Sequence, residues 1–415
     1  MKKNILLITQ IFSKRYSAPA IRWNVFIRHL KSEFNFIIIE FPNDIGPWNY
    51  KVVMKYVDSL NTKLYSIINY PRIKISDLEF RLFELVANKS IYGLLYGSLI
   101  NRLDEIIKNE CIDLAIASVP PFHTGILAYY LYKKYQIPYI IDVRDLIEYF
   151  YFYQEFKNMN ILGKALRINT IYKNYVRAIE HASVLTTVTP VFKKILELTY
   201  KKRVYLLPNG ITVSPENIIH YSKRPKQLVI LEAAKKGLGG NLGIKTIVKA
   251  WANEVIKKFP EYKLLVIGDI VEVVRNLFDT IPKNIVLVGR IPFDDVIKIL
   301  SMSRGCIIWC LDSDNPAYTG AVPVKFYDSI GTGMPVYAQG PNSYLSLLIK
   351  SYHLGEYVYD KYKCDYNLLA NSLIKFIENI EKGLYDFENI LNVRRKFLRI
   401  NYISTLKRII ENIIY

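Results

Sequence analysis

Cysteine is scarce in this sequence, and its spacing does not suit a metal ion. The 415 residues contain 4 Cys, and no two of them form a Cys-x-x-Cys pair. Cys306 and Cys310 fall in an apolar run that is typical of a core strand, whereas Cys111 and Cys364 stand alone. We therefore expect buried free thiols, with neither a disulfide framework nor a metal site.

Long apolar runs are also missing. No stretch approaches the roughly 18 residues that a membrane-spanning helix needs. The opening Met-Lys-Lys-Asn leads directly into Ile-Leu-Leu-Ile, which is too short for the core of a secretory signal and indicates a first strand. A Gly-x-Gly-x-x-Gly motif does not follow that strand, which argues against a Rossmann dinucleotide site. We expect a cytoplasmic protein.

Positive charge and tyrosine are abundant. Lys and Arg number 56 against 37 Asp and Glu, so the net charge is +19, and 33 Tyr and 19 Phe are spread among them. Such a surface would suit an anionic membrane face or nucleic acid, although simple compositional bias is an equal alternative. An apolar fraction of 51% indicates a globular chain, and the length suits two domains of roughly 200 residues each.

Short apolar runs alternate with amphipathic segments, which predicts α/β domains with parallel sheets whose ligands bind at the carboxyl ends of the strands. Residues 44–110 are compatible with helices rich in aromatic and basic residues. Residues 146–180 favour an aromatic, basic helix hairpin, and either a docking surface for a lipid-linked acceptor or ordinary core packing would explain its aromatic residues. The expected strands are residues 4–10, 36–41, 112–118, 137–145, 263–269, 284–290, 305–311 and 334–338. Residues 180–190 are expected to form a strand that enters a capped helix, and a second domain restarts with the apolar segment 227–233.

The segment from Pro323 to Ala338 combines a predicted helix, a tight turn and a strand. Pro323 suits a helix start, and Gly331 or Gly333 suits its exit. Lys325 lies in the first turn, where a helix N-terminus and a cation together favour an anion such as a diphosphate. Asp328 follows one turn later and could accept hydrogen bonds from a ribose diol. The alternative is an ordinary surface helix capped at both ends.

Three segments resemble motifs of retaining glycosyltransferases with the GT-B fold, especially the family-four enzymes. Lys325 to Val336 is similar to their Lys-x-x-Glu-x-x-Ala-x-Gly-x-Pro-Val segment, and Pro208-Asn-Gly-Ile211 to their Pro-Asn-Gly-Ile-Asp. The most specific match joins Ser118-x-Pro-x-x-x-x-Gly125 to the Pro138-x-x-x-Asp-x-Arg-Asp145 strand.

The resemblance implies two doubly wound, Rossmann-like domains facing a cleft. The expected parts are an acceptor-side domain over residues 1–211, a linker over 212–226, a nucleotide-sugar-binding domain over 227–388 and a helical segment over 389–415 that crosses back to the first domain. The implied reaction moves a sugar, with retention, from a nucleotide-diphosphate sugar to a surface-glycan or lipid-linked acceptor. No metal or other cofactor is implied, and peripheral contact with an anionic membrane is consistent with it; no nucleic-acid partner is expected.

The same resemblance suggests which residues form the site, each with a plainer alternative. The expected catalytic residues are His123, Asp142, Arg144 and Asp145, with Arg22 on the acceptor side; a helix cap and a buried ion pair are the alternatives. The expected donor-binding residues are Lys235, Lys236, Lys245, Gly268, Gly289, Arg290, Gly320, Lys325 and Asp328. A solvated charged loop would account for the lysines, and ordinary strand–helix turns for Gly268 and Gly289.

Three positions depart from the family pattern. Gly320 stands where the first glutamate of the Glu-x7-Glu pair would fall, Leu242 replaces the lysine of a Lys-Gly pair, and Thr212 replaces an aspartate. Asp312-Ser-Asp314 has the spelling of a metal motif, but it lies in the loop where the relatives bind the donor without metal. A non-catalytic GT-B-fold protein that binds a partner therefore remains an alternative.

Overall fold

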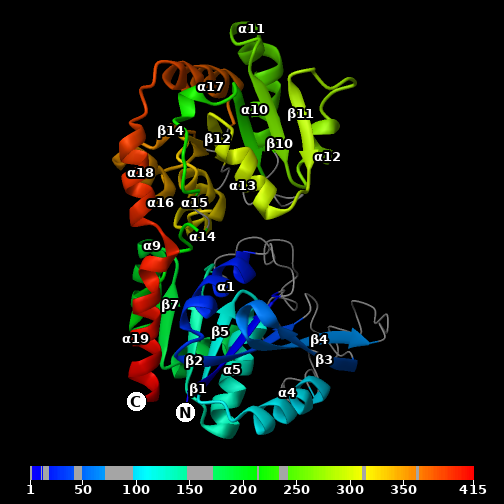
Figure 1. Ribbon diagram of the computed structural model, residues 1–415, viewed down its shortest axis with the longest axis vertical. Helices are drawn as coiled ribbons and strands as arrows, with labels where there is room; N and C mark the ends of the chain where they lie inside the picture. Colours follow the sequence, from blue (N-terminus) through cyan, green and yellow to red (C-terminus); the bar gives the residue numbers. More distant parts are fainter. Residues whose placement is uncertain are drawn as a thin grey trace. The chain divides into compact units, whose positions relative to one another are not determined.

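The computed structural model describes residues 2–10, 12, 18–41, 49–70, 97–146, 172–212, 215–232, 242–310, 315–360 and 364–415 (Figure 1). The chain forms two compact units. Unit 1 comprises Met1–Pro208 and Tyr402–Tyr415, and unit 2 comprises Asn209–Asn401. These units are groups of residues in mutual contact, so the functional domain limits drawn from the sequence stay predictions.

Unit 1 is built on an eight-stranded sheet with the order β3-β4-β2-β1-β5-β6-β7-β8. All neighbouring strands are parallel except β3 and β4. The strands are β1 (Lys3–Gln10), β2 (Phe34–Phe41), β3 (Asn49–Val57), β4 (Thr62–Tyr70), β5 (Leu114–Val119), β6 (Tyr139–Val143), β7 (Val184–Thr187) and β8 (Val204–Leu206). The helices are α1 (Ala18–Leu30), α4 (Gly97–Glu110), α5 (Phe122–Tyr135), α8 (Lys173–His181), α9 (Pro190–Tyr200) and α19 (Ile403–Ile414).

The central strands of this sheet are covered on both faces, as their unbroken apolar runs predict. Leu6 and Leu7 are adjacent in β1 and therefore point to opposite faces, and both are fully buried. On the Leu7 face, α1 and α19 contribute Trp23 and Ile410 to one apolar core. Figure 1 shows α19, in red, beside the elements of unit 1, although its residues come last in the chain.

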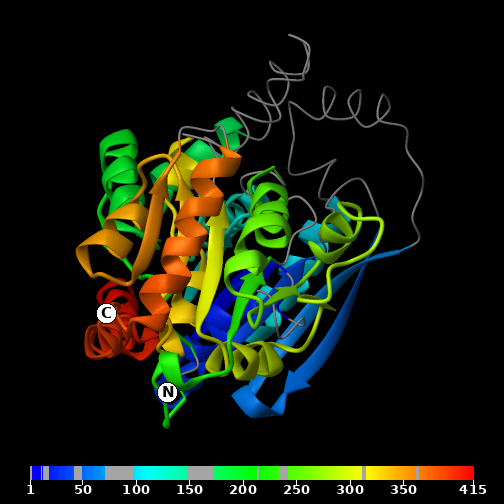
Figure 2. The same ribbon diagram turned by 90° about the horizontal axis from the view of Figure 1, so that it is seen from above.

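Residues 49–70 correct the interpretation of residues 44–110 as helices. They form the antiparallel hairpin of β3 and β4, drawn in blue in Figure 2. A 3-10 turn over Asp58–Leu60 ends at Asn61, whose φ of 53° is left-handed, and Val57 then pairs with Thr62. Asparagine tolerates that conformation better than most residues, so a local turn signal was present. Of the expected helices, α4 does form at the end of this segment.

Unit 2 is built on a six-stranded parallel sheet with the order β11-β10-β9-β12-β13-β14. The strands are β9 (Gln227–Leu231), β10 (Lys263–Ile267), β11 (Ile285–Gly289), β12 (Gly305–Cys310), β13 (Val336–Gly340) and β14 (Gly355–Tyr359). The helices include α10 (Leu242–Ala250), α12 (Val271–Arg275), α13 (Phe293–Ser301), α14 (Pro316–Thr319), α15 (Val324–Gly331), α16 (Tyr344–Ser351), α17 (Tyr366–Glu381) and α18 (Phe387–Lys396), with a π-helical turn over Trp251–Val255.

The predicted segment around Lys325 has the structure that its residues indicate. Pro323 is the N-cap of α15, and Gly333, with φ +74°, follows the helix before β13 begins. Phe326, Ile330 and Met334 are fully buried, so α15 is a core helix and not an ordinary surface helix. Its first turn lies at the carboxyl edge of the sheet, because the helix follows β12 and precedes β13 in a parallel arrangement.

Candidate functional site

Each sheet reverses its strand order at one point, and ligands of open parallel sheets bind at such points. In unit 1 the chain builds outward from β1 to β2 and then places β5 on the other side of β1. In unit 2 it builds from β9 to β10 and β11 and then places β12 on the other side of β9. The two candidate sites are therefore the carboxyl ends of β1 and β5, and those of β9 and β12.

The first site contains a buried ion pair between α1 and β6. The Arg22 guanidinium donates to both carboxylate oxygens of Asp142, at 3.1 and 3.0 Å, and the two side chains are 1% and 0% exposed. Thr186 of β7 donates to the same carboxylate at 2.7 Å, and Arg22 also reaches the Pro208 carbonyl oxygen at 2.9 Å. Arg22 and Asp142 therefore form a buried ion pair that fixes α1 against β6. A buried ion pair is the structural alternative that was given for Asp142 above.

Arg144 and Asp145 follow β6 and are less buried than Asp142. The backbone N–H of Arg144 donates to Val119 at 2.8 Å, and its guanidinium donates to the Pro120 carbonyl at 2.7 Å, so the side chain ties β6 to the end of β5. Removal from water lowers the pKa of Arg144 and raises the pKa of Asp145, and the neighbouring opposite charges of the two groups act against both shifts. Both side chains remain partly accessible at the edge where a ligand of unit 1 would bind.

His123 lies in the first turn of α5, directly after β5. Its side chain is partly exposed, but enough protein surrounds the ring to lower its pKa to about 4 through desolvation. The imidazole is therefore neutral at physiological pH and can donate one hydrogen bond and accept another. Of the five residues predicted for this region, His123, Arg144 and Asp145 are partly exposed just beyond the carboxyl ends of β5 and β6. The other two, Arg22 of α1 and Asp142 of β6, are buried.

In the second site, Lys325 pairs with a carboxylate that the sequence analysis did not single out. The Lys325 ammonium lies 2.5 Å from Oε2 of Glu232, the residue that follows β9, and the two side chains are 18% and 16% exposed. Lys325 belongs to the first turn of α15, where a cation opposes the helix dipole. A carboxylate beside it offsets that unfavourable position.

Asp328 is nearly buried, at 6% exposed, in the middle of α15. Among the described residues none donates a hydrogen bond to its carboxylate, and desolvation raises its pKa to about 7 while the charge of Arg399 acts in the opposite direction. Arg399 in turn donates to the carbonyl oxygens of Asn209 and, at 3.2 Å, Gly210. The carboxylate therefore retains acceptor capacity in a low-dielectric place, which favours a ligand that brings hydroxyl donors.

The two predicted strand-end glycines are explained by backbone conformation. Gly268 and Gly289 have φ of 105° and 77°, which other residues rarely adopt, and Gly268 N–H donates to the Gly289 carbonyl at 2.8 Å. Arg290, which follows, holds Asp269 through two contacts of 2.7 Å but is 74% exposed. Lys325 and Arg290 are the two predicted donor-binding cations that lie beside strand ends, and each is bonded to a carboxylate of the protein.

The remaining predicted donor residues are less informative. Gly320 caps the short helix α14 and is buried, with its N–H bonded to the Pro316 carbonyl at 2.9 Å. Gly320 therefore provides no carboxylate at the position of the first glutamate of the Glu-x7-Glu pair. Lys245 is partly exposed on α10 and forms no ion pair with the described residues, whereas Lys235 and Lys236 lie outside the described residues.

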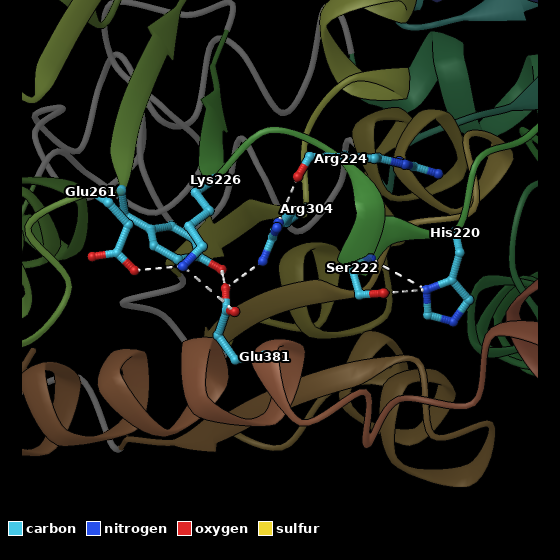
Figure 3. A network of polar contacts seen from close by, with 8 residues as sticks. His220, Ser222, Arg224, Lys226, Glu261, Arg304 and Glu381 are labelled. Atoms are coloured by element: carbon cyan, nitrogen blue, oxygen red, sulfur yellow. Dashed lines mark hydrogen bonds and ion pairs between the residues drawn. The ribbon is translucent and has the colours of Figure 1, made fainter.

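A larger polar network in unit 2 lies at the opposite edge of the same sheet (Figure 3). Lys226, Tyr262 and Arg304 immediately precede β9, β10 and β12, so the network marks the amino ends of the strands. Lys226 contacts Glu261 at 2.7 Å, and Arg304 and Tyr262 both donate to Glu381 of α17. Because ligands of parallel sheets bind at the carboxyl ends, we interpret this network as a structural connection between the sheet and α17.

The described part of the chain offers no evident metal or membrane-spanning element. It has no group of three or more His, Cys, Asp or Glu side chains that could hold a metal ion. None of its helices combines the length and the apolar character needed to cross a bilayer.

Architecture and strand order together define the GT-B fold: two Rossmann-like bodies with parallel sheets. Solved structures of that fold cover almost the whole chain. Sucrose-phosphate synthase from Thermosynechococcus elongatus has a TM-score of 0.69 and 14% identity and covers 99% of both chains. WaaG, a glycosyltransferase involved in lipopolysaccharide biosynthesis, has a TM-score of 0.57 and 11% identity and covers 97% of this chain and 99% of its own.

The same fold also carries other chemistry. A protein from Listeria monocytogenes assigned as a UDP-N-acetylglucosamine 2-epimerase has a TM-score of 0.58 and 10% identity and covers 98% of this chain and 94% of its own. No protein-family model matches the sequence, and no curated protein matches it in a sequence search. At these identities the likeness establishes the fold, and the activity has to be argued from the site.

Three residues of these sites escaped the sequence analysis. Glu232 and Thr186 each lie at or just beyond the carboxyl end of a predicted strand, so a signal was present, but their partners are distant in the sequence. Arg399 begins a 3-10 turn over Arg399–Tyr402, after α18, and no local pattern indicates that its guanidinium bonds to Asn209 and acts on Asp328.

Proposed function

We propose that the protein is a glycosyltransferase that takes its sugar from a nucleotide-diphosphate sugar bound by unit 2. The observation that carries the proposal is α15 at the strand-order reversal of that unit: a cation in its first turn and, one turn later, a buried carboxylate that accepts no hydrogen bond from the described residues. A diphosphate and a sugar or ribose diol supply the two complementary groups, an anion and hydroxyl donors.

In this reaction the chemical difficulty is the leaving group. Negative charge develops on the diphosphate as the glycosidic bond breaks, and a positive group aimed at it lowers the barrier. Lys325 and the N-terminus of α15 would stabilise that charge, while the Asp328 carboxylate would orient the donor by accepting from hydroxyl groups. His123, Arg144 and Asp145 would bind the acceptor at the edge of unit 1.

The finer parts of the proposal extend the resemblance to known glycosyltransferases. We propose that transfer proceeds with retention, without a metal ion, and to a glycan or lipid-linked acceptor at the cytoplasmic membrane face. The role of WaaG in lipopolysaccharide biosynthesis supports an acceptor of this kind. The strong net positive charge supports peripheral contact with an anionic membrane.

A donor screen tests the proposal. Purified protein would be incubated with UDP-, GDP-, ADP- and CDP-linked sugars, with and without a lipid-linked acceptor, and scored for nucleotide release and for the configuration of the product. Acceptor-dependent release that is lost in Lys325→Ala and Asp328→Ala supports the glycosyltransferase. Epimerisation of the donor without transfer would contradict it.

A second candidate is a non-catalytic GT-B-fold protein that binds a partner. Gly320 in place of a carboxylate and the pairing of Lys325 with Glu232 favour it, because both reduce the donor-binding groups at this edge. This candidate predicts that calorimetry detects no binding of any nucleoside diphosphate to the wild-type protein, which separates it from the enzyme before any acceptor is known.

A further inference from the structure

The cation that the proposed function assigns to the donor diphosphate is already bonded to an anion of the protein. Within the described residues the Lys325 ammonium makes one polar contact, to Oε2 of Glu232 at 2.5 Å. Both side chains are mostly buried. Glu232 directly follows β9, and Lys325 lies in α15, which follows β12, so the pair lies beside the strand-order reversal between β9 and β12. The pair is therefore located where a donor would place its phosphates.

We propose that Glu232 is a specificity-determining residue that competes with the donor diphosphate for Lys325. When the donor binds, the ammonium exchanges the carboxylate for a phosphate oxygen. This inference rests on the proposed function, because it concerns the same donor site, but it assigns to Glu232 a role of its own: it sets how much negative charge a ligand must bring.

Two anions, the Glu232 carboxylate and the donor diphosphate, compete for one cation, the Lys325 ammonium. The Lys325–Glu232 pair carries no net charge, so a ligand gains little attraction from Lys325 until the pair opens. A ligand that takes Lys325 removes that countercharge from the Glu232 carboxylate and brings its own negative charge close to it, which costs further free energy in a partly desolvated place. A nucleoside diphosphate can offset these costs better than a nucleoside monophosphate, because it presents more negative charge and more acceptor oxygens.

The test removes the negative charge of Glu232 and keeps its shape. Glu232→Gln is expected to bind UDP, GDP or ADP, whichever binds the wild type best, roughly twofold to fivefold more tightly in isothermal titration calorimetry, the range expected for a partly exposed ion pair that no longer competes. The corresponding monophosphate is expected to gain no more than the diphosphate does, because it attracts Lys325 less strongly and carries less negative charge for Glu232 to repel.

The chain provides a matched control in Glu261→Gln. This substitution removes the same charge from the same unit, and Glu261 is likewise paired with a lysine, Lys226, at 2.7 Å, but at the amino edge of the sheet (Figure 3). Its affinity for the same nucleotide should equal that of the wild type. An equal gain in both variants would mean that net charge alone raises affinity, and it would overturn the assignment to Glu232.

A second background shows whether the exchange involves Lys325. In Lys325→Met protein the further change Glu232→Gln should improve binding much less than it does with the lysine present. An undiminished improvement would mean that Glu232 only repels the ligand, and a loss of affinity in Glu232→Gln alone would mean that it positions Lys325; either result overturns the competition.

Failure of this inference is distinguishable from failure of the proposed function. If the wild type binds a nucleoside diphosphate, Lys325→Met weakens that binding and Glu232→Gln leaves it unchanged, then the donor site stands and the competition is wrong. If neither the wild type nor Glu232→Gln binds any nucleoside diphosphate while both unfold at the same temperature, the donor site itself is wrong, and the competition with it.

Discussion

Arg22 and Asp142 are 120 residues apart in the sequence, yet they form a two-bond ion pair of 3.1 and 3.0 Å in the core of unit 1. Arg22 reaches from α1 to β6 and continues to the Pro208 carbonyl, where the chain leaves unit 1. The pair therefore fixes a helix, a strand end and the last residue of the unit's long segment relative to one another. Burying either charge without the other would cost several kcal/mol of free energy, so each partner depends on the other.

Asp142→Asn is expected to lower the free energy of unfolding by roughly 3–5 kcal/mol, because it leaves the Arg22 guanidinium buried without a countercharge. Urea denaturation followed by circular dichroism measures the change. Arg28→Met is the control, since Arg28 lies exposed on the same helix and should change stability by less than about 1 kcal/mol. A small effect of Asp142→Asn would show that the pair is hydrated in solution.

Protonation of His123 should make the free energy of unfolding depend on pH. Its pKa is lowered to about 4 in the folded protein, below the roughly 6.5 of an unfolded histidine, so the unfolded state takes up the proton first as the pH falls. The free energy of unfolding is therefore expected to decrease between about pH 6.5 and 4, by up to about 3 kcal/mol. The decrease should be absent from the pH profile of His123→Gln, so it should appear in full in the difference between the wild-type and variant profiles. NMR should place the imidazole titration of the wild type near pH 4.

Asp328 should have the opposite influence on pH dependence. Its pKa is raised from 3.8 to about 7, so the folded state keeps a proton that the unfolded state loses. Between about pH 4 and 7 the free energy of unfolding should then fall as the pH rises, by at most about 4 kcal/mol, and remain level above pH 7. Asp328→Asn removes the ionisation, and its unfolding free energy measured across this range should lack that slope.

The same ionisation should appear in ligand binding. If Asp328 accepts from donor hydroxyl groups, its ionised form binds more strongly, and the nucleotide-sugar affinity of the wild type should rise as the pH passes through 7. Asp328→Asn should bind weakly and without that dependence. Equal pH profiles for the two proteins would remove Asp328 from the donor site.

Gly333 is expected to tolerate no side chain. Its φ of +74° is unfavourable for other residues, and an added Cβ would lie 2.7 Å from Cγ2 of Ile218 and 3.2 Å from the Phe387 ring. Gly383 provides the control, because its φ is +65° but an added Cβ would have no neighbour within 4 Å. Thermal unfolding should show that Gly383→Ala costs about 1 kcal/mol and Gly333→Ala distinctly more, with part of the difference recovered by Ile218→Ala.

The sequence predicted most of the parallel strands because each is a short, unbroken apolar run, and it predicted α15 because a proline and a glycine bound it. It did not predict β3 and β4. Their nine-residue segments mix Lys and Tyr with β-branched residues, and that mixture fits either an amphipathic helix or a strand. The decisive feature was the turn ending at Asn61, which joins two strands in register.

The candidate site was predictable in its location and less so in its contacts. Strand ends and a helix start are local features, so the sequence could place His123 and Arg144 after strands and Lys325 and Asp328 in the helix that follows Pro323. Their roles stay predictions. The partners of Lys325 and Asp328 were not found from the sequence, because Glu232 lies 93 residues before Lys325 and Arg399 lies in a turn beyond α18. Pairing over such separations is set by the packing of the whole unit, which no local pattern records.

Helix α19 also has a consequence for how the protein is made. Leu406, Ile409 and Ile410 complete the same core as β1 and α1, but all of unit 2 lies between them in the chain. During synthesis, the part of the N-terminal sheet's apolar surface that α19 covers therefore stays exposed until the ribosome has added about two hundred further residues. Unit 2 can fold before unit 1 is complete. Because apolar surface of unit 1 is exposed during that interval, we expect the nascent chain to depend on chaperones.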